Sequence, residues 1–251
     1  ESSIRGALRM TVEEGKKNVC VLNFANGTNP GGGVLSKSSA QEESLCRSSA
    51  LYNSLIQKSD FYEYNQENDS NLSSNYLIFS PDCPTWKIDN FEKLNQPFTV
   101  SYLSATAVLN CNIQTREEIR QIHDDRIKAI LYCAICNGVK NFVLGAFGCG
   151  AFKNHPEDVA QSFKHWLVDE NLKDYFESIS FSIIERKDAR INKKVRNIDV
   201  FAQVFGLPII ETEKYNQESN IEEEHQDHQE QPNEEEEKHE QNAEGDEKQE
   251  Q

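Results

Sequence analysis

Two adjacent glutamates, Glu42 and Glu43, directly follow Gln41, and a seven-residue spacer separates Gln41 from a run of three glycines. Paired carboxylates are suited to general acid–base catalysis. A glycine loop lets backbone N–H groups approach an anion. Carboxylates at the start of a helix also complement its positive end without any catalytic role. The string alone therefore leaves two interpretations open, a reactive site and a simple helix start.

A second glycine loop, GAFGCGAF at residues 145–152, has the same context as the first. Each loop follows an apolar run and precedes a predicted helix, and ligands of open α/β sheets lie at the carboxyl ends of strands. Two such loops side by side predict a nest of N–H donors for a diphosphate. Neither loop carries the Gly-Lys-Ser/Thr of a P-loop or the Rossmann spacing. The alternative is that both are only tight connections.

The cysteines do not predict a metal site or a nucleophile. Cys133 and Cys136 have a metal or redox spacing, but they fall inside an apolar helical stretch without a second matching pair. We therefore expect both to pack in the core. Cys149 lies in the second loop without an evident histidine partner, so packing is expected there too. No metal and no cofactor are predicted.

Hydrophobic patterning places these loops between alternating strands and helices. Helices are expected at 4–15, 40–57, 116–137 (with a capping box at Thr115 and Glu118), from Pro156 onward, and before Phe205. Strands are expected at 19–24, 76–79, 98–103, 141–144 and 179–184, and the polar stretch 59–75 is expected to be a surface insertion. The alternation predicts a three-layer α/β domain.

Charge divides the chain into a body and a tail. The formal net charge is −16. Residues 212–251 hold sixteen acidic residues and three lysines, which leaves about −3 for residues 1–211. The tail has almost no aliphatic side chains, so it cannot offset the entropy cost of folding and is predicted to be disordered. The prediction is thus one folded domain, 1–211, and an acidic tail, 212–251.

Composition also narrows the partners. The body has no basic block, which argues against duplex DNA binding driven by counterion release. No stretch is apolar enough for a membrane span. An odd count of seven cysteines favours reduced thiols, hence the cytoplasm or the nucleus. We expect a monomer.

The glycine–glutamate string and its surroundings resemble the microbial-type poly(ADP-ribose) glycohydrolases. The string is FANGTNPGGG at 24–33, followed by Gln41, Glu42 and Glu43; SPDCP at 80–84 and VLGAFGCGAF at 143–152 continue the resemblance. It covers about residues 4–205 and implies a three-layer α/β/α macrodomain with a mixed central sheet. The family's members usually carry more chain before the first helix, so a missing N-terminal part is expected.

The resemblance also implies roles for individual residues. Glu43 is expected to be the catalytic acid, Glu42 to hold ribose hydroxyls, and Gln41 to order the loop. Asn26 is expected to contact the ribose next to the cleaved bond. The implied substrate-binding residues are Asn26, Gly31, Gly32, Gly33, Val34, Phe147, Gly148, Cys149, Gly150, Ala151 and Phe152, with the glycine loops around the diphosphate and Phe152 against a sugar.

The implied substrate is an ADP-ribose polymer or an ADP-ribosylated protein. Hydrolysis of its ribose–ribose bonds needs a protonated acid at the leaving oxygen. Negative charge on Glu42 and on the substrate favours the protonated form of Glu43. Two other functions share the pocket: removal of single ADP-ribose units from protein or nucleic acid, and ADP-ribose binding without catalysis. The retained glutamate pair argues against the last.

Overall fold

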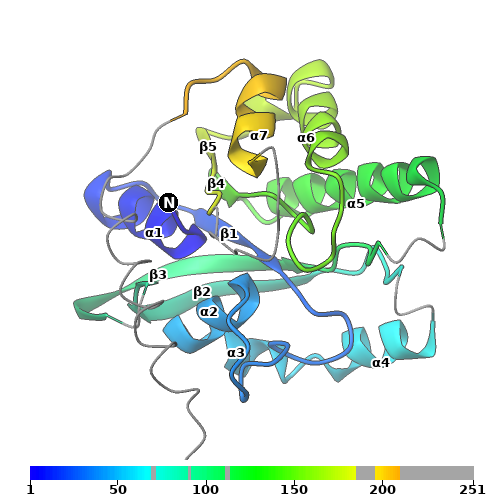
Figure 1. The fold of residues 1–251 in the computed structure, drawn as a ribbon. Coiled ribbons are helices and arrows are strands. Elements are labelled where there is room, and N and C mark those ends of the chain that lie inside the picture. Colours follow the sequence, from blue (N-terminus) through cyan, green and yellow to red (C-terminus); the bar gives the residue numbers. More distant parts are fainter. Residues whose placement is uncertain (69–71, 90–91, 111–113, 185–195, 210–251) are drawn as a thin grey trace, which may run out of the picture. The chain divides into compact units, whose positions relative to one another are not determined.

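The computed structural model describes residues 1–68, 72–89, 92–110, 114–184 and 196–209. Residues 1–209 form one compact unit, drawn in Figure 1. The expected acidic tail lies outside the described residues.

A five-stranded mixed sheet organises this unit in the order β2-β3-β1-β4-β5. β3, β1, β4 and β5 run parallel, and β2 pairs antiparallel with β3. The strands are β1 Val19–Phe24, β2 Ile78–Lys87, β3 Lys93–Ala105, β4 Asn141–Leu144 and β5 Ser178–Phe181. The predicted mixed sheet is confirmed.

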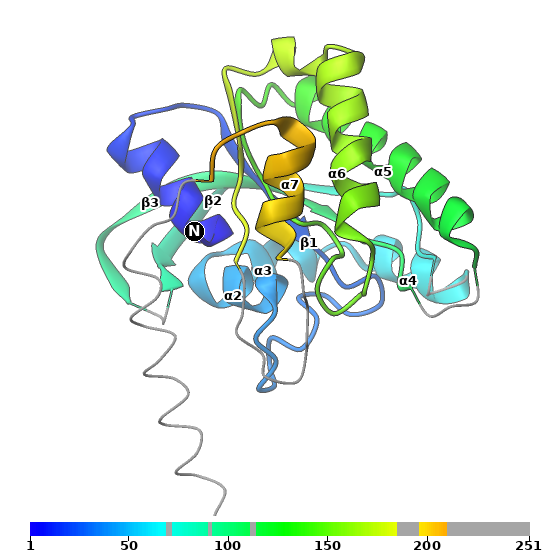
Figure 2. The same ribbon diagram turned by 45° about the horizontal axis from the view of Figure 1, so that its top comes forward.

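Helices cover both faces of the sheet, as Figures 1 and 2 show. On one face lie α5 Arg116–Cys136, α6 Pro156–Lys164 and α7 Asn197–Phe205. On the other lie α1 Ser3–Leu8 with the π-helical turn η1 Arg9–Glu13, α2 Gln41–Ser48, α3 Leu51–Leu55 and α4 Ser59–Glu67. Shorter turns, η3 His165–Asp169 and η4 Leu172–Tyr175, follow α6. The three-layer prediction is therefore confirmed.

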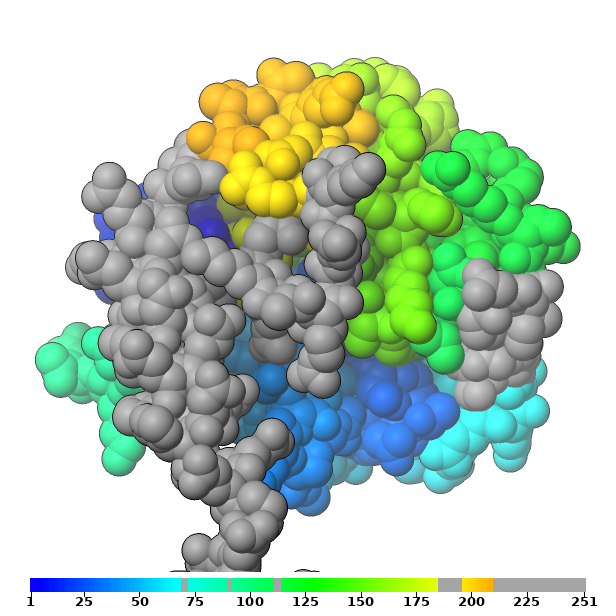
Figure 3. All heavy atoms as spheres, in the orientation of Figure 1, coloured from blue at the N-terminus to red at the C-terminus, as the bar shows by residue number. Residues whose placement is uncertain are grey.

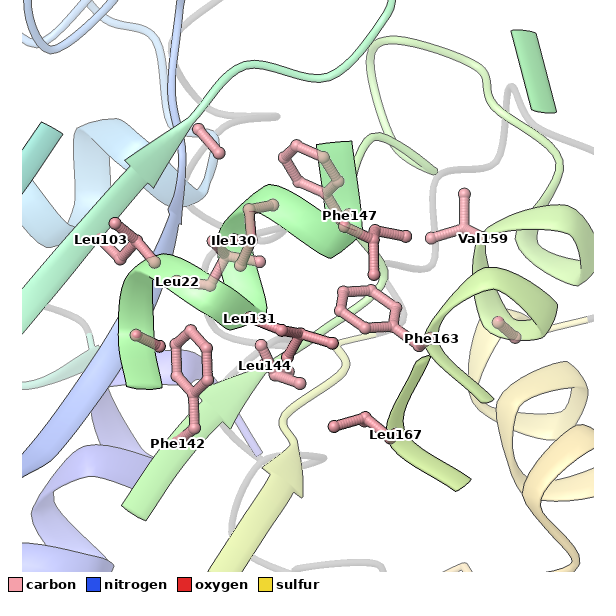
Figure 4. Packing of buried hydrophobic residues seen from close by; sticks show 14 of the residues in the cluster. Leu22, Leu103, Ile130, Leu131, Phe142, Leu144, Phe147, Val159, Phe163 and Leu167 are labelled. Atoms are coloured by element: carbon pink, nitrogen blue, oxygen red, sulfur yellow. The ribbon is translucent and has the colours of Figure 1, made fainter. Parts of the chain in front are cut away.

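Side-chain alternation along β1 explains the two cores. Cys20 and Leu22 point into the cluster under α5 and α6, whereas Val19 and Val21 join the cluster under α1 and α2. Figure 4 shows the first cluster, in which Leu22, Leu103, Ile130 and Phe163 meet between sheet and helices. A strand that is buried on both faces carries apolar residues on both, and the apolar run at residues 19–24 predicted such a strand.

Three expectations about single elements were wrong. Residues 59–67 form α4 rather than a surface insertion, because Phe61 and Tyr62 are buried within an otherwise polar segment. The helix expected at 40–57 breaks at Ser49, whose hydroxyl accepts from the Leu51 N–H and donates to the Leu45 carbonyl. Cys136 is exposed instead of packed in the core.

The β2–β3 hairpin is much longer than the two short strands expected. Pro81 and Pro84 lie within β2, and prolines lower the strand signal because they cannot donate to a ladder. Irregular register between Ser80 and Cys83 accommodates this part of the strand. β2 is an edge strand, where prolines are tolerated.

Candidate active site

Both glycine loops lie at the same edge of the sheet. They follow β1 and β4, which are parallel neighbours, and they lead to the N-termini of α2 and α6. In Figure 3 the lime-green surface around the second loop borders the blue surface of the first. The two loops and two helix N-termini therefore converge as the sequence predicted.

Gln41 fastens the start of α2 to the end of β1. Its Oε1 accepts from the Phe24 N–H at 2.8 Å, and its Nε2 donates to the Leu22 carbonyl at 2.8 Å and to Ser3 Oγ at 3.0 Å. These bonds satisfy backbone groups where β1 leaves the sheet. They also fix the position from which the next two side chains project.

Glu42 is buried, with an exposed fraction of 3%. Its Oε2 accepts from the Asn26 N–H at 2.8 Å and its Oε1 from Asn23 Nδ2 at 3.2 Å. Burial raises the pKa of Glu42 to about 8, the two hydrogen bonds oppose the rise, and the charge of Glu43 adds to it. Burial therefore favours a proton on Glu42 itself at neutral pH, and not the negative charge that the sequence analysis expected there.

Glu43 is held on one oxygen only. Its Oε1 accepts from the Gly33 N–H at 2.9 Å. Its Oε2 is buried and has no hydrogen-bond partner among the described residues. A carboxyl fixed in this way has a defined direction and one oxygen left for a proton and a ligand.

The glycines of the first loop allow the backbone to approach the carboxylates closely. A Cβ on Gly32 would lie 2.6 Å from Glu43 Oε1 and 3.2 Å from Glu42 Oε2, so both carboxylates border this residue. Gly32 also has a φ of +55°, which side chains disfavour. Gly31 has a φ of +67°. The Val34 carbonyl accepts from Arg47, which secures the far end of the loop.

Asn26 shapes the first loop from within. Its Oδ1 accepts from the Thr28 N–H, the Thr28 hydroxyl and the Asn29 N–H, at 2.8 to 3.0 Å. Such an Asx turn uses the carboxamide oxygen fully. Its Nδ2 makes no hydrogen bond within the described chain, so that group is the one free to meet a ligand.

The second loop presents backbone donors. In the part of the chain that the structure describes, the N–H groups of Gly148, Gly150, Ala151 and Phe152 have no acceptor. Gly150 and Ala151 are exposed. A run of free N–H groups beside a helix N-terminus is an anion-binding arrangement.

Phe147 and Cys149 lie beneath the loop. The Phe147 side chain is fully buried, edge-on to Phe24 at a centroid distance of 5.7 Å. The Cys149 thiol is 1% exposed and donates to the Phe147 carbonyl at 3.6 Å. Both side chains support the loop from the core, so only their backbone can face a ligand.

A third segment, residues 106–110, escaped the sequence analysis. Asn154 Nδ2 donates to the Val108 carbonyl at 2.7 Å and to the Gly148 carbonyl at 3.1 Å. The Asn110 N–H donates to the Phe152 carbonyl at 3.0 Å. This segment follows β3, so it lies at the same sheet edge and braces the second loop. The sequence could have indicated this segment, because it follows β3, a third parallel strand that ends at the same edge of the sheet.

Gly148 lies against this third segment. A Cβ there would be 2.6 Å from both Ala107 Cβ and Asn154 Nδ2, and the φ of +72° already requires glycine. A larger residue at position 148 would therefore disturb the fold, not only a bound ligand. Gly150 differs, because no atom lies within 4 Å of a Cβ placed there.

The described residues hold neither a metal-binding cluster nor a membrane-spanning helix. No group of three histidine, cysteine, aspartate or glutamate side chains could hold a metal ion there. No helix in the described ranges has the length and apolar character to cross a bilayer. The layers, loops and carboxylate pair define a macrodomain-like domain suited to a phosphorylated ligand beside an acid.

Comparison with known proteins identifies the family. The model of the microbial-type PARG catalytic domain matches residues 1–88. The poly(ADP-ribose) glycohydrolase of Thermomonospora curvata is 34% identical over 82% of this chain and 74% of its own, with a TM-score of 0.76. That of Deinococcus radiodurans in complex with ADP-ribose is 30% identical over 82% and 81%, with a TM-score of 0.71. No curated protein sequence matches. The chain belongs to the microbial-type poly(ADP-ribose) glycohydrolase family.

Proposed function

We propose that this protein hydrolyses ribose–ribose O-glycosidic bonds of poly(ADP-ribose) and releases ADP-ribose, with Glu43 as the general acid. The observation that carries the proposal is the Glu43 carboxyl, anchored through Oε1 to the Gly33 N–H and unpartnered at its buried Oε2. Similarity to enzymes solved with ADP-ribose or with the inhibitor ADP-HPD supports the substrate class.

Three side chains, those of Glu43, Glu42 and Gln41, have distinct roles in the proposed reaction. Glu43 Oε2 gives its proton to the leaving ribose oxygen as the glycosidic bond breaks, and positive charge develops on the sugar carbon. Water then adds to that carbon and returns a proton to Glu43. Glu42 accepts hydrogen bonds from ribose hydroxyls, and Gln41 keeps α2 in register with β1.

The remaining predicted residues bind the substrate. The backbone of Gly31, Gly32, Gly33 and Val34, and that of residues 147–151, surrounds the diphosphate. Phe152 packs against a sugar, and Asn26 Nδ2 meets the ribose next to the cleaved bond. The free N–H groups of the second loop support this assignment, because oriented backbone donors bind phosphate without lysine or arginine.

The proposal extends to the setting of the enzyme. The catalytic domain comprises residues 1–211 and acts as a monomer on ADP-ribose polymer or ADP-ribosylated protein, without direct duplex DNA binding. Six described cysteines are unpaired, which fits a reducing compartment, the cytoplasm or the nucleus.

The test is incubation with poly(ADP-ribose) and analysis of the products, with Glu43→Gln beside the wild type. The glutamine carbonyl can still accept from the Gly33 N–H, so affinity for ADP-ribose should stay within a few-fold. Turnover should fall by a factor of about 10²–10⁴, because the proton donor is lost. Glu63→Gln, an exposed position on α4, is the matched control.

Two results would contradict the proposal. A Glu43→Gln enzyme with more than about a tenth of the wild-type turnover at saturating substrate would exclude Glu43 as the acid. Release of ADP-ribose from mono-modified protein or nucleic acid, with no cleavage of polymer, would favour the mono-ADP-ribose hydrolase instead.

A further inference from the structure

Arg126 is a fully buried arginine that the proposed mechanism does not use. It lies on α5 with an exposed fraction of 1%. Its Nη1 donates to the Thr106 carbonyl at 2.7 Å, its Nη2 to the Leu72 carbonyl at 2.9 Å, and its Nε to Asn75 Oδ1 at 3.1 Å. All three acceptors are neutral oxygens from segments that precede α5 in the sequence.

The guanidinium has no anionic partner in the described part of the chain: none of the ion pairs there includes Arg126. Burial lowers the pKa of Arg126 to about 10, so the group stays charged at neutral pH. A buried charge is costly unless an opposite charge balances it. The other arginines of α5 differ, because Arg116 pairs with Asp158 and Arg120 with Glu117 at the surface.

This charge bonds to a segment that borders both glycine loops. Thr106, which accepts from Arg126, borders Gly27 of the first loop: a Cβ on Gly27 would be 3.2 Å from Thr106 Cγ2 and 3.0 Å from Ser73 Oγ. The next residue, Ala107, borders Gly148 of the second loop. Arg126 therefore fixes the Thr106 carbonyl of a segment that borders both predicted diphosphate loops.

We propose that Arg126 is a positioning residue of the substrate site and that its buried charge is balanced when the substrate's diphosphate binds. This inference rests on the proposed function. A site lined by backbone N–H groups gains a full positive charge in this way without a cationic side chain among its walls. Because the charge lies away from bulk water, its attraction for the diphosphate is screened little by salt.

Asn75→Asp tests the inference without changing Arg126. Asn75 is exposed, and its Oδ1 already accepts from Arg126, so the substitution places a carboxylate against the guanidinium with little change of shape. We expect affinity for ADP-ribose, measured by calorimetry, to fall about tenfold because the charge is already balanced. Thermal stability of the free protein should stay the same or rise, since the buried arginine gains a counter-ion.

Two control variants separate charge from contact. Asn53→Asp on α3 makes the same charge change at another exposed asparagine, and should leave affinity within twofold. Asn75→Ala removes one hydrogen bond without adding charge, and should weaken binding less than Asn75→Asp.

Arg126→Met should raise KM by about tenfold and lower kcat much less, because Glu43 stays in place.

The outcomes distinguish this inference from the proposed function. Equal affinity of Asn75→Asp and Asn53→Asp, with wild type binding ADP-ribose, would overturn the role of Arg126 alone. An equal loss in Asn75→Asp and Asn75→Ala would also overturn the charge balance, since the contact would then be what matters. Absence of ADP-ribose binding by the wild type would overturn the proposed function as well.

Discussion

Replacing Glu42 by glutamine should stabilise the protein, and increasingly so as pH rises. The pKa of this carboxyl rises from an ordinary 4.5 to about 8 on folding, mainly through burial. Below about pH 4.5 the group is protonated in folded and unfolded chains alike. Between about 4.5 and 8 only the unfolded chain ionises, so unfolding releases a proton and the free energy of unfolding falls with rising pH. Above about pH 8 the loss is complete.

The size of the effect follows from linkage. One pKa unit corresponds to about 1.4 kcal/mol between the two protonation states, so the ceiling for this group is about 4–5 kcal/mol. Relaxation of a buried pair reduces that figure, and we expect about 2 kcal/mol between pH 5 and pH 8. For a domain of this size the gain corresponds to a Tm rise of about 4–8 °C.

Hydrogen bonding does not oppose this gain. Glutamine keeps one oxygen to accept from the Asn26 N–H. Its new NH₂ group can donate to Asn23 Oδ1, which is buried and has no partner in the described chain, after a rotation of that carboxamide. The comparison therefore isolates the charge. Activity should still fall under the proposed role of Glu42, because glutamine has one acceptor oxygen in place of two for the Asn26 N–H and the ribose hydroxyls.

The assay is urea unfolding of the wild type and Glu42→Gln at pH 5, 6, 7 and 8, with Glu63→Gln as an exposed control on α4. The difference in free energy of unfolding between Glu42→Gln and wild type should grow with pH. The control should show no such trend. A difference that is constant to within about 0.5 kcal/mol from pH 5 to pH 8 would refute the reasoning, because Glu42 would then titrate alike in both states.

The other predictions concern the second loop and the acidic tail. Gly150→Val should weaken ADP-ribose binding at least about tenfold with an unchanged Tm, since its Cβ meets no protein atom; unchanged affinity by calorimetry would make this loop a connection only. Gly148→Val should lower the free energy of unfolding by about 2 kcal/mol or more, because its Cβ would clash at 2.6 Å in a left-handed backbone; a wild-type Tm would contradict this. Deletion of residues 212–251 should raise the association rate for polymer at 0.01 M salt, where the Debye length is about 30 Å, and change it little at physiological salt; stopped-flow rates that match the full chain at both would exclude repulsion by the tail.

Most of the fold was predictable because its signals are local. The apolar run of β1, the capping box of Thr115 and Glu118 and the proline start of α6 each state a local preference that tertiary contacts then reinforce. α4 was missed because a helix with two buried aromatics in nine residues carries too little periodicity. β2 was shortened because its prolines conceal a strand that pairs on one side only.

The candidate site also has a part that the sequence predicts and a part that only the tertiary structure shows. The glutamates and glycines stand in short strings, and the parallel order of β1 and β4 brings the strings together. The sequence of the second loop does not show which of its glycines has room for a side chain. Gly148 and Gly150 are two residues apart, yet only Gly148 faces Ala107. That difference depends on the segment after β3, which the chain contributes from forty residues upstream.

The burial of Arg126 could have been predicted from its position on the apolar face of α5. At about 100° per residue, Arg120 lies about 40° from Arg116, so those two share a face of α5. Arg126 lies about 240° from Arg120 and within about 40° of Ile119 and Ile130, the apolar stripe of the helix. A charged residue in such a stripe must be buried, and a buried charge needs an opposite one. Among the described residues no carboxylate pairs with Arg126, and we propose that the diphosphate of the substrate supplies the opposite charge.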